Sequence, residues 1–233
     1  MAPHPAPARA LPAAPARRPA PPVAAAHPGV LAEKPFLGCA GLAITDEIRL
    51  TVAAQACLPL LNRPDAVYPA LRQILVYPGP FVVDRAHTDG TGVLQNMRQV
   101  LAGESWSQGQ VILSWQDVAE DAAHPDAGRN VVIHEFAHQL DQETGSANGA
   151  PELPSAQAYA RWSQVLGAEY AQLQQRSAQG LGGLLDSYGA TSPAEFFAVV
   201  SEAFFLQPQP LALEHPALFD ELRRFYGIDP LAW

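Results

Sequence analysis

The residues of this 233-residue chain that are best suited to chemistry are two histidines and a glutamate in one apolar segment, 131–141. His134 and His138 are four residues apart, so on a helix their side chains project from the same face. Two imidazole nitrogens in that arrangement can bind one small cation, and Glu135 can act as a base toward a metal-activated water. Because burying these groups unsatisfied is unfavourable, a metal site is the first hypothesis. The alternative is a chance match, in which both histidines are core residues held by hydrogen bonds.

A catalytic zinc site needs three protein ligands and one open position for water. The third ligand is expected on a second apolar helix, which begins with Ser192 as N-cap and Pro193 as its first residue. Glu195 and Glu202 are seven residues apart on one face of that helix, so both are candidates. Glu195 also completes a capping box with Ser192, which would explain it without a metal. His215 is a weaker candidate, because it precedes a proline at the start of a last helix.

Two acidic residues are candidates for orienting the metal-binding histidines. Asp141 lies one turn beyond His138 and could accept the free ring N–H of a ligand. It could equally be a solvated helix residue. Glu202, two turns beyond Glu195, is the second candidate for this role. Spacing leaves these alternatives open.

Several further segments, in a fixed order from Glu33 to the C-terminus, carry a family resemblance. They are Glu33-Lys34-Pro35-Phe36, Thr51 to Cys57, Val76 to Gly79, Val111 to Trp115, His134 to Asp141, Ala147 to Pro151, and Tyr188-Gly189 with Glu195 to Ala198. Together they resemble the Mlc titration factor A-like family of bacterial zinc metallopeptidases. That family is related to the catalytic domain of anthrax toxin lethal factor.

The resemblance implies a role for each site residue. It implies that His134, His138 and Glu195, rather than Glu202, bind Zn²⁺, and that Glu135 is the general base. Tyr188 matches a tyrosine that stabilises the transition state in related peptidases; its alternative is a partly buried core tyrosine beside a glycine turn. The implied activity is that of a zinc-dependent peptidase, or more narrowly an aminopeptidase, acting on a peptide substrate. The alternative is a regulatory protein that sequesters a transcriptional repressor of the Mlc type, with weak or no turnover.

Composition defines the expected domains and compartment. Residues 1–32 are predicted to be a disordered Pro/Ala-rich tail and residues 33–233 one domain, because 48% of the chain is hydrophobic. Subtracting the tail charge of +3 from the total of −9 leaves −12 on the domain, which disfavours direct nucleic-acid binding. No apolar run is long enough for a signal or membrane segment, so a cytoplasmic protein with no membrane partner is expected. Cys39 and Cys57 are then expected to be reduced thiols.

The expected fold is α+β, a helix-rich, zincin-like domain with a small sheet. The expected elements are a helix that starts after Thr45 and runs toward Leu61, strands at 73–77, 81–83 and 110–115, a helix or loop at 92–102, and helices at 130–142, 156–176, after Ser192 and from Pro216. By resemblance to zincin peptidases, strand 110–115 is expected to pair with an extended peptide. The alternative is an ordinary sheet strand.

Overall fold

The computed structural model of this chain describes residues 30, 33–63, 67–88, 94–106 and 108–233, with the backbone alone described at 84–88 and 94–99. The predicted tail, 1–32, lies outside the described residues apart from Val30. That residue is fully buried, and its carbonyl accepts a hydrogen bond from the Lys34 N–H at 3.2 Å. The hydrophobic core therefore includes a residue that precedes the predicted domain boundary.

A four-stranded mixed sheet forms one side of the molecule. Its strands lie in the order β1 (Phe36–Gly38), β2 (Gln73–Tyr77), β6 (Gln110–Ser114) and β5 (Gly103–Trp106). The first three are parallel, and β5 pairs antiparallel with β6. The strands predicted at 73–77 and 110–115 are confirmed as β2 and β6, although Trp115 already belongs to α3. They are the two interior strands, and their inward residues are fully buried. β5 was not predicted, and it forms one edge of the sheet.

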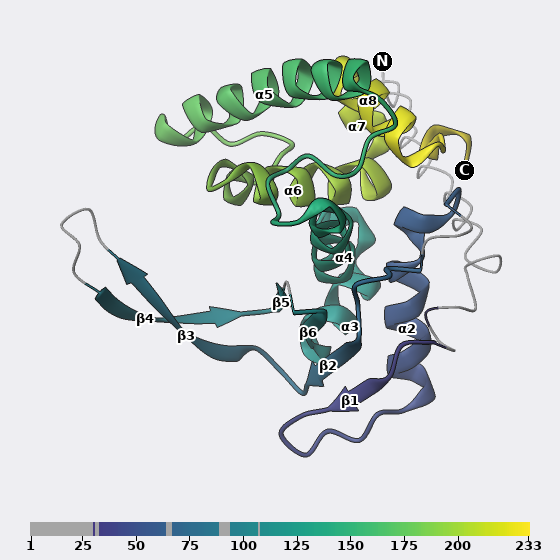
Figure 1. The fold of residues 1–233 in the computed structure, drawn as a ribbon, viewed down its shortest axis with the longest axis vertical. Coiled ribbons are helices and arrows are strands. Elements are labelled where there is room, and N and C mark those ends of the chain that lie inside the picture. Colours follow the sequence, from purple (N-terminus) through teal and green to yellow (C-terminus); the bar gives the residue numbers. More distant parts are fainter. Residues whose placement is uncertain (1–29, 31–32, 64–66, 89–93, 107) are drawn as a thin grey trace, which may run out of the picture.

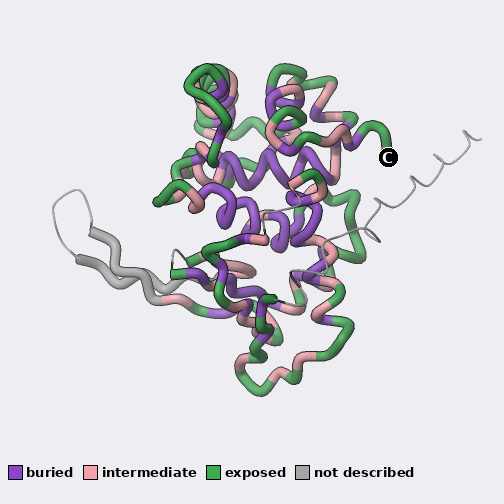
Figure 2. The backbone as a smooth tube through the Cα atoms, turned by 45° about the vertical axis from the view of Figure 1, so that its right-hand side comes forward, coloured by how far each residue is buried: buried purple, intermediate pink, exposed green. Residues whose placement is uncertain are grey.

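The helices stack in layers on this sheet. Their bounds are α2 (Asp46–Ala56), α3 (Trp115–Ala123), α4 (Val131–Asp141), α5 (Ala156–Ala178), α6 (Pro193–Leu206), α7 (Pro208–Glu214) and α8 (Pro216–Tyr226). Helix α4 packs on β5 and β6 with one side and on α6 with the other. Helices α5, α7 and α8 cover the far side of α6 (Figure 1). Burial is concentrated along α4 and α6, the central pair (Figure 2). The α+β expectation is confirmed.

A two-stranded hairpin, β3 (Phe81–Thr88) and β4 (Leu94–Leu101), extends away from the body (Figure 1). Its register pairs Val82 with Val100, and both side chains are largely exposed. The prediction of a helix or loop at 92–102 was wrong. Residues 94–101 pair with β3, but their sequence lacks the regular apolar alternation by which a strand is predicted.

The helix starts follow from capping residues that the sequence shows. Thr45, Asn130 and Ser192 each accept a hydrogen bond from the backbone N–H three residues later, which fixes the first turns of α2, α4 and α6. Within the described ranges, no single helix meets the length and apolarity needed to cross a bilayer; α6 and α7 do so only jointly, with a 117° bend between them.

Candidate metal centre

Helix α4 carries both histidines and the glutamate, and almost the whole helix is buried. Ten of its eleven residues are buried, and the exception, His134, has a side chain only 13% exposed. Asn130 closes the first turn by accepting the Ile133 N–H at 2.9 Å. The helix is therefore fixed by packing on both sides, and the two imidazoles are held in place by the fold.

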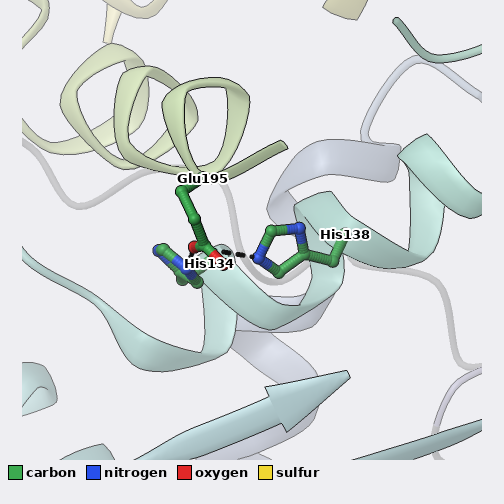
Figure 3. Close-up of side chains that lie close together, drawn as sticks. All are labelled: His134, His138 and Glu195. Carbon is green, nitrogen blue, oxygen red and sulfur yellow. Dashed lines mark hydrogen bonds and ion pairs between the residues drawn. The ribbon is translucent and has the colours of Figure 1, made fainter. Parts of the chain in front are cut away.

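Three side chains from α4 and α6 converge at one point. A nitrogen from each of His134 and His138 and an oxygen from Glu195 lie within 4.8 Å of one another. Glu195 Oε2 is 2.9 Å from His134 Nε2 and 3.3 Å from His138 Nε2. Figure 3 shows the carboxylate reaching from α6 toward both rings. The sequence-predicted pair and Glu195 are thus brought together.

The hydrogen bonds of His134 fit this cluster to a cation. His134 Nδ1 lies 2.7 Å from Glu202 Oε1, and because a carboxylate only accepts, Nδ1 carries the proton. A positive charge is needed between Nε2 and the Glu195 oxygen, because the lone pair of a neutral ring would repel the carboxylate. Burial lowers the pKa of His134, but the hydrogen bonds to Glu195 and Glu202 outweigh it and raise that pKa well above its ordinary value, so without a metal a proton on Nε2 supplies this charge. A divalent cation can take the place of that proton, because two imidazole nitrogens and a carboxylate are a donor set that suits it.

The anionic character of Glu195 is also favoured here. Burial acts to raise its pKa, yet the hydrogen bonds and charges of His134 and His138 bring the pKa well below its ordinary value. The first half of the predicted capping box is present, because Ser192 Oγ accepts the Glu195 N–H at 3.2 Å. The carboxylate oxygen Oε2 is directed at the histidines instead. Glu195 can therefore serve the helix start through its backbone and a cation through its side chain.

Asp141 and Gly149 place the start of α6 against the end of α4. Asp141 Oδ2 accepts the Gly149 N–H at 2.7 Å, and the Gly149 carbonyl accepts from Trp162 Nε1 at 2.8 Å. Gly149 has φ +78°, and a Cβ there would lie 2.4 Å from the Pro193 carbonyl oxygen. Only glycine allows this close approach to the first residue of α6, two positions before Glu195.

The two candidate orienting acids differ in where their hydrogen bonds go. Glu202 contacts His134 directly, and its Oε2 accepts the Asn130 N–H at 2.5 Å, so it links the ligand to the start of α4. Asp141 is fully buried, so the solvated alternative was wrong. Its hydrogen bond goes to Gly149, while His138 Nδ1 is buried without a hydrogen-bond partner among the described residues. Of these two acids, Glu202 is therefore the one that is hydrogen-bonded to a metal-binding candidate, His134.

Glu135 is buried beside the cluster against the edge strand. A Cβ added to Gly103 would lie 2.6 Å from Glu135 Oε1 and 2.7 Å from Val131 Cγ2, so β5 approaches α4 as closely as a glycine allows. Burial raises the pKa of Glu135 to about 7, opposed by the charges of His134 and His138. A carboxyl group whose pKa is near neutrality can both accept and return a proton at physiological pH.

A cleft of about 530 Å³ opens next to the cluster and contains Glu135 and Tyr188 in its lining. Tyr188 lies in a short 3₁₀ turn, Ser187–Ala190, and is 44% exposed, so the core-tyrosine alternative was wrong. Its ring centroid is 5.9 Å from that of His134. Asp186 fixes the turn by accepting the Tyr188 N–H at 2.8 Å. The segment 183–188 thus forms one wall of the cleft.

The expectation that strand 110–115 pairs with a peptide was wrong. This strand, β6, already has β2 on one side and β5 on the other. The edge strands are β1 and β5, and β5 is the one that packs against α4. Because the Ser114 N–H donates to the Ala102 carbonyl, the ladder alternates so that Gly103 and Ser105 direct their backbone groups away from β6. A short edge strand without alternation gave no sequence signal.

His215, the weaker candidate for a third ligand, lies elsewhere. Its Nδ1 is 2.7 Å from Glu169 Oε2, at the junction of α7 and α8 with α5. Two other residues that shape the site were not predicted: Gly103, and Asp121, whose Oδ2 accepts the Val131 N–H at 2.8 Å. Their roles depend on contacts between separate elements of the fold.

Comparison with known proteins shows the family to which the chain belongs. A family model described as "Glucose-regulated metallo-peptidase M90" matches residues 24–227. The chain therefore belongs to this family of metallopeptidases. An uncharacterized protein of Synechocystis is 44% identical over 202 residues, covering 86% of this chain and 74% of the relative. Mlc titration factor A of Serratia proteamaculans is 37% identical over 206 residues (87% and 78%), and that of Klebsiella pneumoniae is 37% identical over 205 residues (87% and 76%).

Proposed function

We propose that this protein is a zinc-dependent peptidase with a zincin-like fold, in which His134, His138 and Glu195 hold the metal. The observation that carries the proposal is the convergence of these three ligand atoms within 4.8 Å, beside a buried glutamate and at the edge of a cleft. Two nitrogens and one carboxylate oxygen match catalytic zinc sites, which leave a position open for water. Membership in a metallopeptidase family supports the same conclusion.

The residues around the metal divide the chemistry among them. When bound, zinc supplies Lewis acidity, which polarises a peptide carbonyl and lowers the pKa of water toward neutrality. Glu135 accepts the proton of the attacking water and passes a proton to the leaving amine. Tyr188, at the cleft wall beside His134, donates its hydroxyl proton in a hydrogen bond to the oxyanion that forms on the substrate. Glu202 holds His134 in the tautomer that leaves Nε2 free.

The edge of β5 supports a preference for removing N-terminal residues. A peptide added antiparallel to β5 would pair with the outward backbone groups of Gly103, next to Glu135, and its N-terminal side would extend over Ser105. There the edge is covered: Gln139 Nε2 donates to Ser105 Oγ at 2.7 Å, and Gln142 Nε2 lies 3.4 Å from the Ser105 carbonyl. Few residues can therefore precede the scissile bond, as in an aminopeptidase.

The direct test replaces the general base while keeping the ligands. Glu135→Gln should bind one zinc per chain, as the unaltered protein does, but lower kcat by roughly a hundredfold to ten-thousandfold. The measurements are metal content by atomic spectroscopy and cleavage of a panel of aminoacyl and peptide substrates, with and without a chelator. Glu120→Gln on α3, an exposed glutamate outside the cleft, is the matched control and should retain full activity. Full activity of Glu135→Gln would assign the base elsewhere.

A second candidate function is binding of a transcriptional repressor. It is favoured by the name Mlc titration factor A, which relatives at 37% identity carry. In this alternative the protein sequesters a repressor of the Mlc type and has weak or no turnover. Repressor binding that persists with a chelator, together with no chelator-sensitive cleavage of any peptide in the panel, would favour sequestration over catalysis.

A further inference from the structure

The cleft continues beyond the metal ligands toward the start of α4. Val100 and Leu101 from β4, together with Leu184 and Ala203, contribute apolar side chains to its lining. Val100 is 69% exposed, so an apolar surface is available there to a bound chain. This end of the cleft would receive the residues that follow the scissile bond, if the peptide runs antiparallel to β5 as proposed above. The inference below therefore rests on the proposed function.

Arg129 lies at the far end of this apolar stretch and lines the cleft. It follows a tight turn in which Gly128 has φ +73° and a Cβ would meet the Gln207 side chain at 2.5 Å, so the turn is closely fixed. Arg129 Nε lies 3.5 Å from Asp121 Oδ1, while the arginine side chain remains 62% exposed. Asp121 is itself buried and bonded to the Val131 N–H. The guanidinium is thus held from one side and accessible from the other.

Arg129 is the one permanent cation among the described residues that line the cleft, and it lies among carboxyl groups of Asp121, Glu135, Asp186 and Glu202. Carboxylates keep their charge when they accept hydrogen bonds, and three of these groups accept them from this chain: Glu202 from Asn130, Asp121 from Val131, and Asp186 from Tyr188. Asp121 holds one side of the guanidinium, and the arginine side chain is 62% exposed. Arg129 is therefore the position in this cleft where a substrate carboxylate can meet a cation.

We propose that Arg129 is a specificity-determining residue that binds a carboxylate on the leaving side of the substrate. Arg129 precedes His134 by five residues, a separation of roughly 10 Å along the chain. An extended peptide covers this distance with about three residues. The carboxylate is either an Asp or Glu side chain within about three residues after the scissile bond or a free C-terminus. An arginine fork can bind either source through two parallel hydrogen bonds.

The experiment compares peptides that differ only in charge at one position. The probes are Ala-Ala-Leu-Glu-amide, Ala-Ala-Leu-Gln-amide, Ala-Ala-Leu-Lys-amide and Ala-Ala-Leu-Gln with a free carboxylate, and products are quantified by mass spectrometry. The zinc-loaded full chain should cleave the Glu peptide with a kcat/KM about five- to tenfold above that of the Gln amide. The ratio should fall as salt rises, because screening weakens the pair.

Variants at Arg129 separate charge from folding. In Arg129→Gln the Glu-to-Gln ratio should approach one, in Arg129→Lys most of the ratio should remain, and in Arg129→Glu the preference should shift to the Lys peptide. Arg223→Gln on α8, an exposed arginine outside the cleft, is the matched control and should keep the unaltered ratio. Because the readout is a ratio, a general loss of activity in a variant does not imitate the result. A ratio near one in the unaltered protein, or one unchanged in Arg129→Gln, would overturn the proposal.

Binding measurements keep this proposal distinct from peptidase activity. Glu135→Gln, loaded with zinc, should bind the Glu peptide about five- to tenfold more tightly than the Gln amide by isothermal titration calorimetry, with the difference lost in Glu135→Gln/Arg129→Gln. If no peptide is cleaved but this difference appears, peptidase function fails and the Arg129 site stands. If only the free-carboxylate peptide is preferred, the C-terminus is the source; if only the Glu amide is preferred, it is the side chain. Cleavage with no preference for either carboxylate refutes the Arg129 site alone.

Discussion

Among the described residues, two histidine–glutamate groupings have nearly identical pair geometry and different surroundings. In one, between α4 and α6, His134 and His138 share Glu195 and His134 also contacts Glu202. In the other, His215 Nδ1 lies 2.7 Å from Glu169 Oε2. A single histidine and carboxylate are fully satisfied by one proton. Two histidines that share one carboxylate oxygen, with a second carboxylate behind them, form a cluster that a cation satisfies better.

Packing explains why only one of these groupings is suited to a metal. The cluster lies between the two most buried helices, and its acids arrive on α6, whose start is fixed by Gly149 and Ser192. His215 lies at the junction of the short helices α7 and α8, and Glu169 lies in the middle of α5, so one donor from each side meets there. The side chains of this pair are about 15% exposed, which is similar to the 10–23% of His134, His138 and Glu195, so exposure does not separate the two groupings. A site must hold several donors at fixed separations before a metal arrives, so convergence on rigid elements matters more than the residue types alone.

The sharpest test of the comparison substitutes the acid in each grouping. Glu195→Gln should lower zinc affinity by roughly a hundredfold or more, because loss of a direct ligand costs more affinity than loss of a residue that hydrogen-bonds to a ligand. Glu169→Gln, the same chemical change in the second grouping, should leave affinity and the one-to-one stoichiometry unchanged. Competition with a chromophoric chelator measures both. Equal losses in the two variants would mean that the cluster is not the metal site.

A smaller loss of zinc affinity is expected when the carboxylate that hydrogen-bonds to His134, Glu202, is replaced. Glu202→Gln replaces the acceptor of the His134 Nδ1 proton with an amide that can present either its oxygen or its nitrogen. Zinc affinity should fall about ten- to a hundredfold. Asp141→Asn serves as the comparison, since Asp141 makes its hydrogen bond to Gly149. We expect Asp141→Asn to lower the free energy of unfolding more than it lowers zinc affinity. If Asp141→Asn weakened zinc binding more than Glu202→Gln did in the chelator competition, Asp141 rather than Glu202 would be the acid that orients a ligand.

The position of Glu135 can be tested without changing Glu135. Gly103→Ala should lower kcat by about tenfold, because the new Cβ would lie 2.6 Å from Glu135 Oε1 and displace the carboxyl group. Metal content should stay at one per chain, since the ligands are on α4 and α6. Gly167→Ala on α5, where a Cβ meets nothing within 4 Å, is the matched control. Loss of metal together with activity would show that the edge strand supports the ligands rather than the base.

The sequence predicts one half of the centre better than the other for a physical reason. Helix α4 is determined locally: an Asn130 cap, an apolar run and two histidines one turn apart specify which side chains share a face. The choice between Glu195 and Glu202 depends on how α6 crosses α4, which spacing along α6 does not contain. The contacts of Gly103 and Arg129 depend likewise on β5 and a turn meeting α4 in space. The family resemblance supplied Glu195, and it gave no indication of the open edge of β5.

The smallest predicted effect concerns the second grouping and pH. The hydrogen bond with Glu169 raises the pKa of His215 above its ordinary value, although burial opposes this. Since the folded-state pKa exceeds the unfolded one, the stabilisation is fully present below the unfolded value of about 6.5 and is lost as pH rises through the folded value. The unfolding free energy of the unaltered protein should therefore exceed that of His215→Gln by about 1 kcal/mol at pH 5.5 and by less at pH 8.5.

Urea unfolding across this pH range measures the difference, and the metal centre, common to both proteins, cancels. Glu169→Gln should remove the same pH dependence, and the double variant should add nothing further, because both changes break one interaction. A pH-dependent difference that survives in Glu169→Gln would mean that His215 responds to another group, such as Glu214 or Arg176, whose charges also act on it. In that case the second grouping would be a wider charge network, and its contrast with the His134–His138–Glu195 cluster would rest on how many ligand atoms converge at one point.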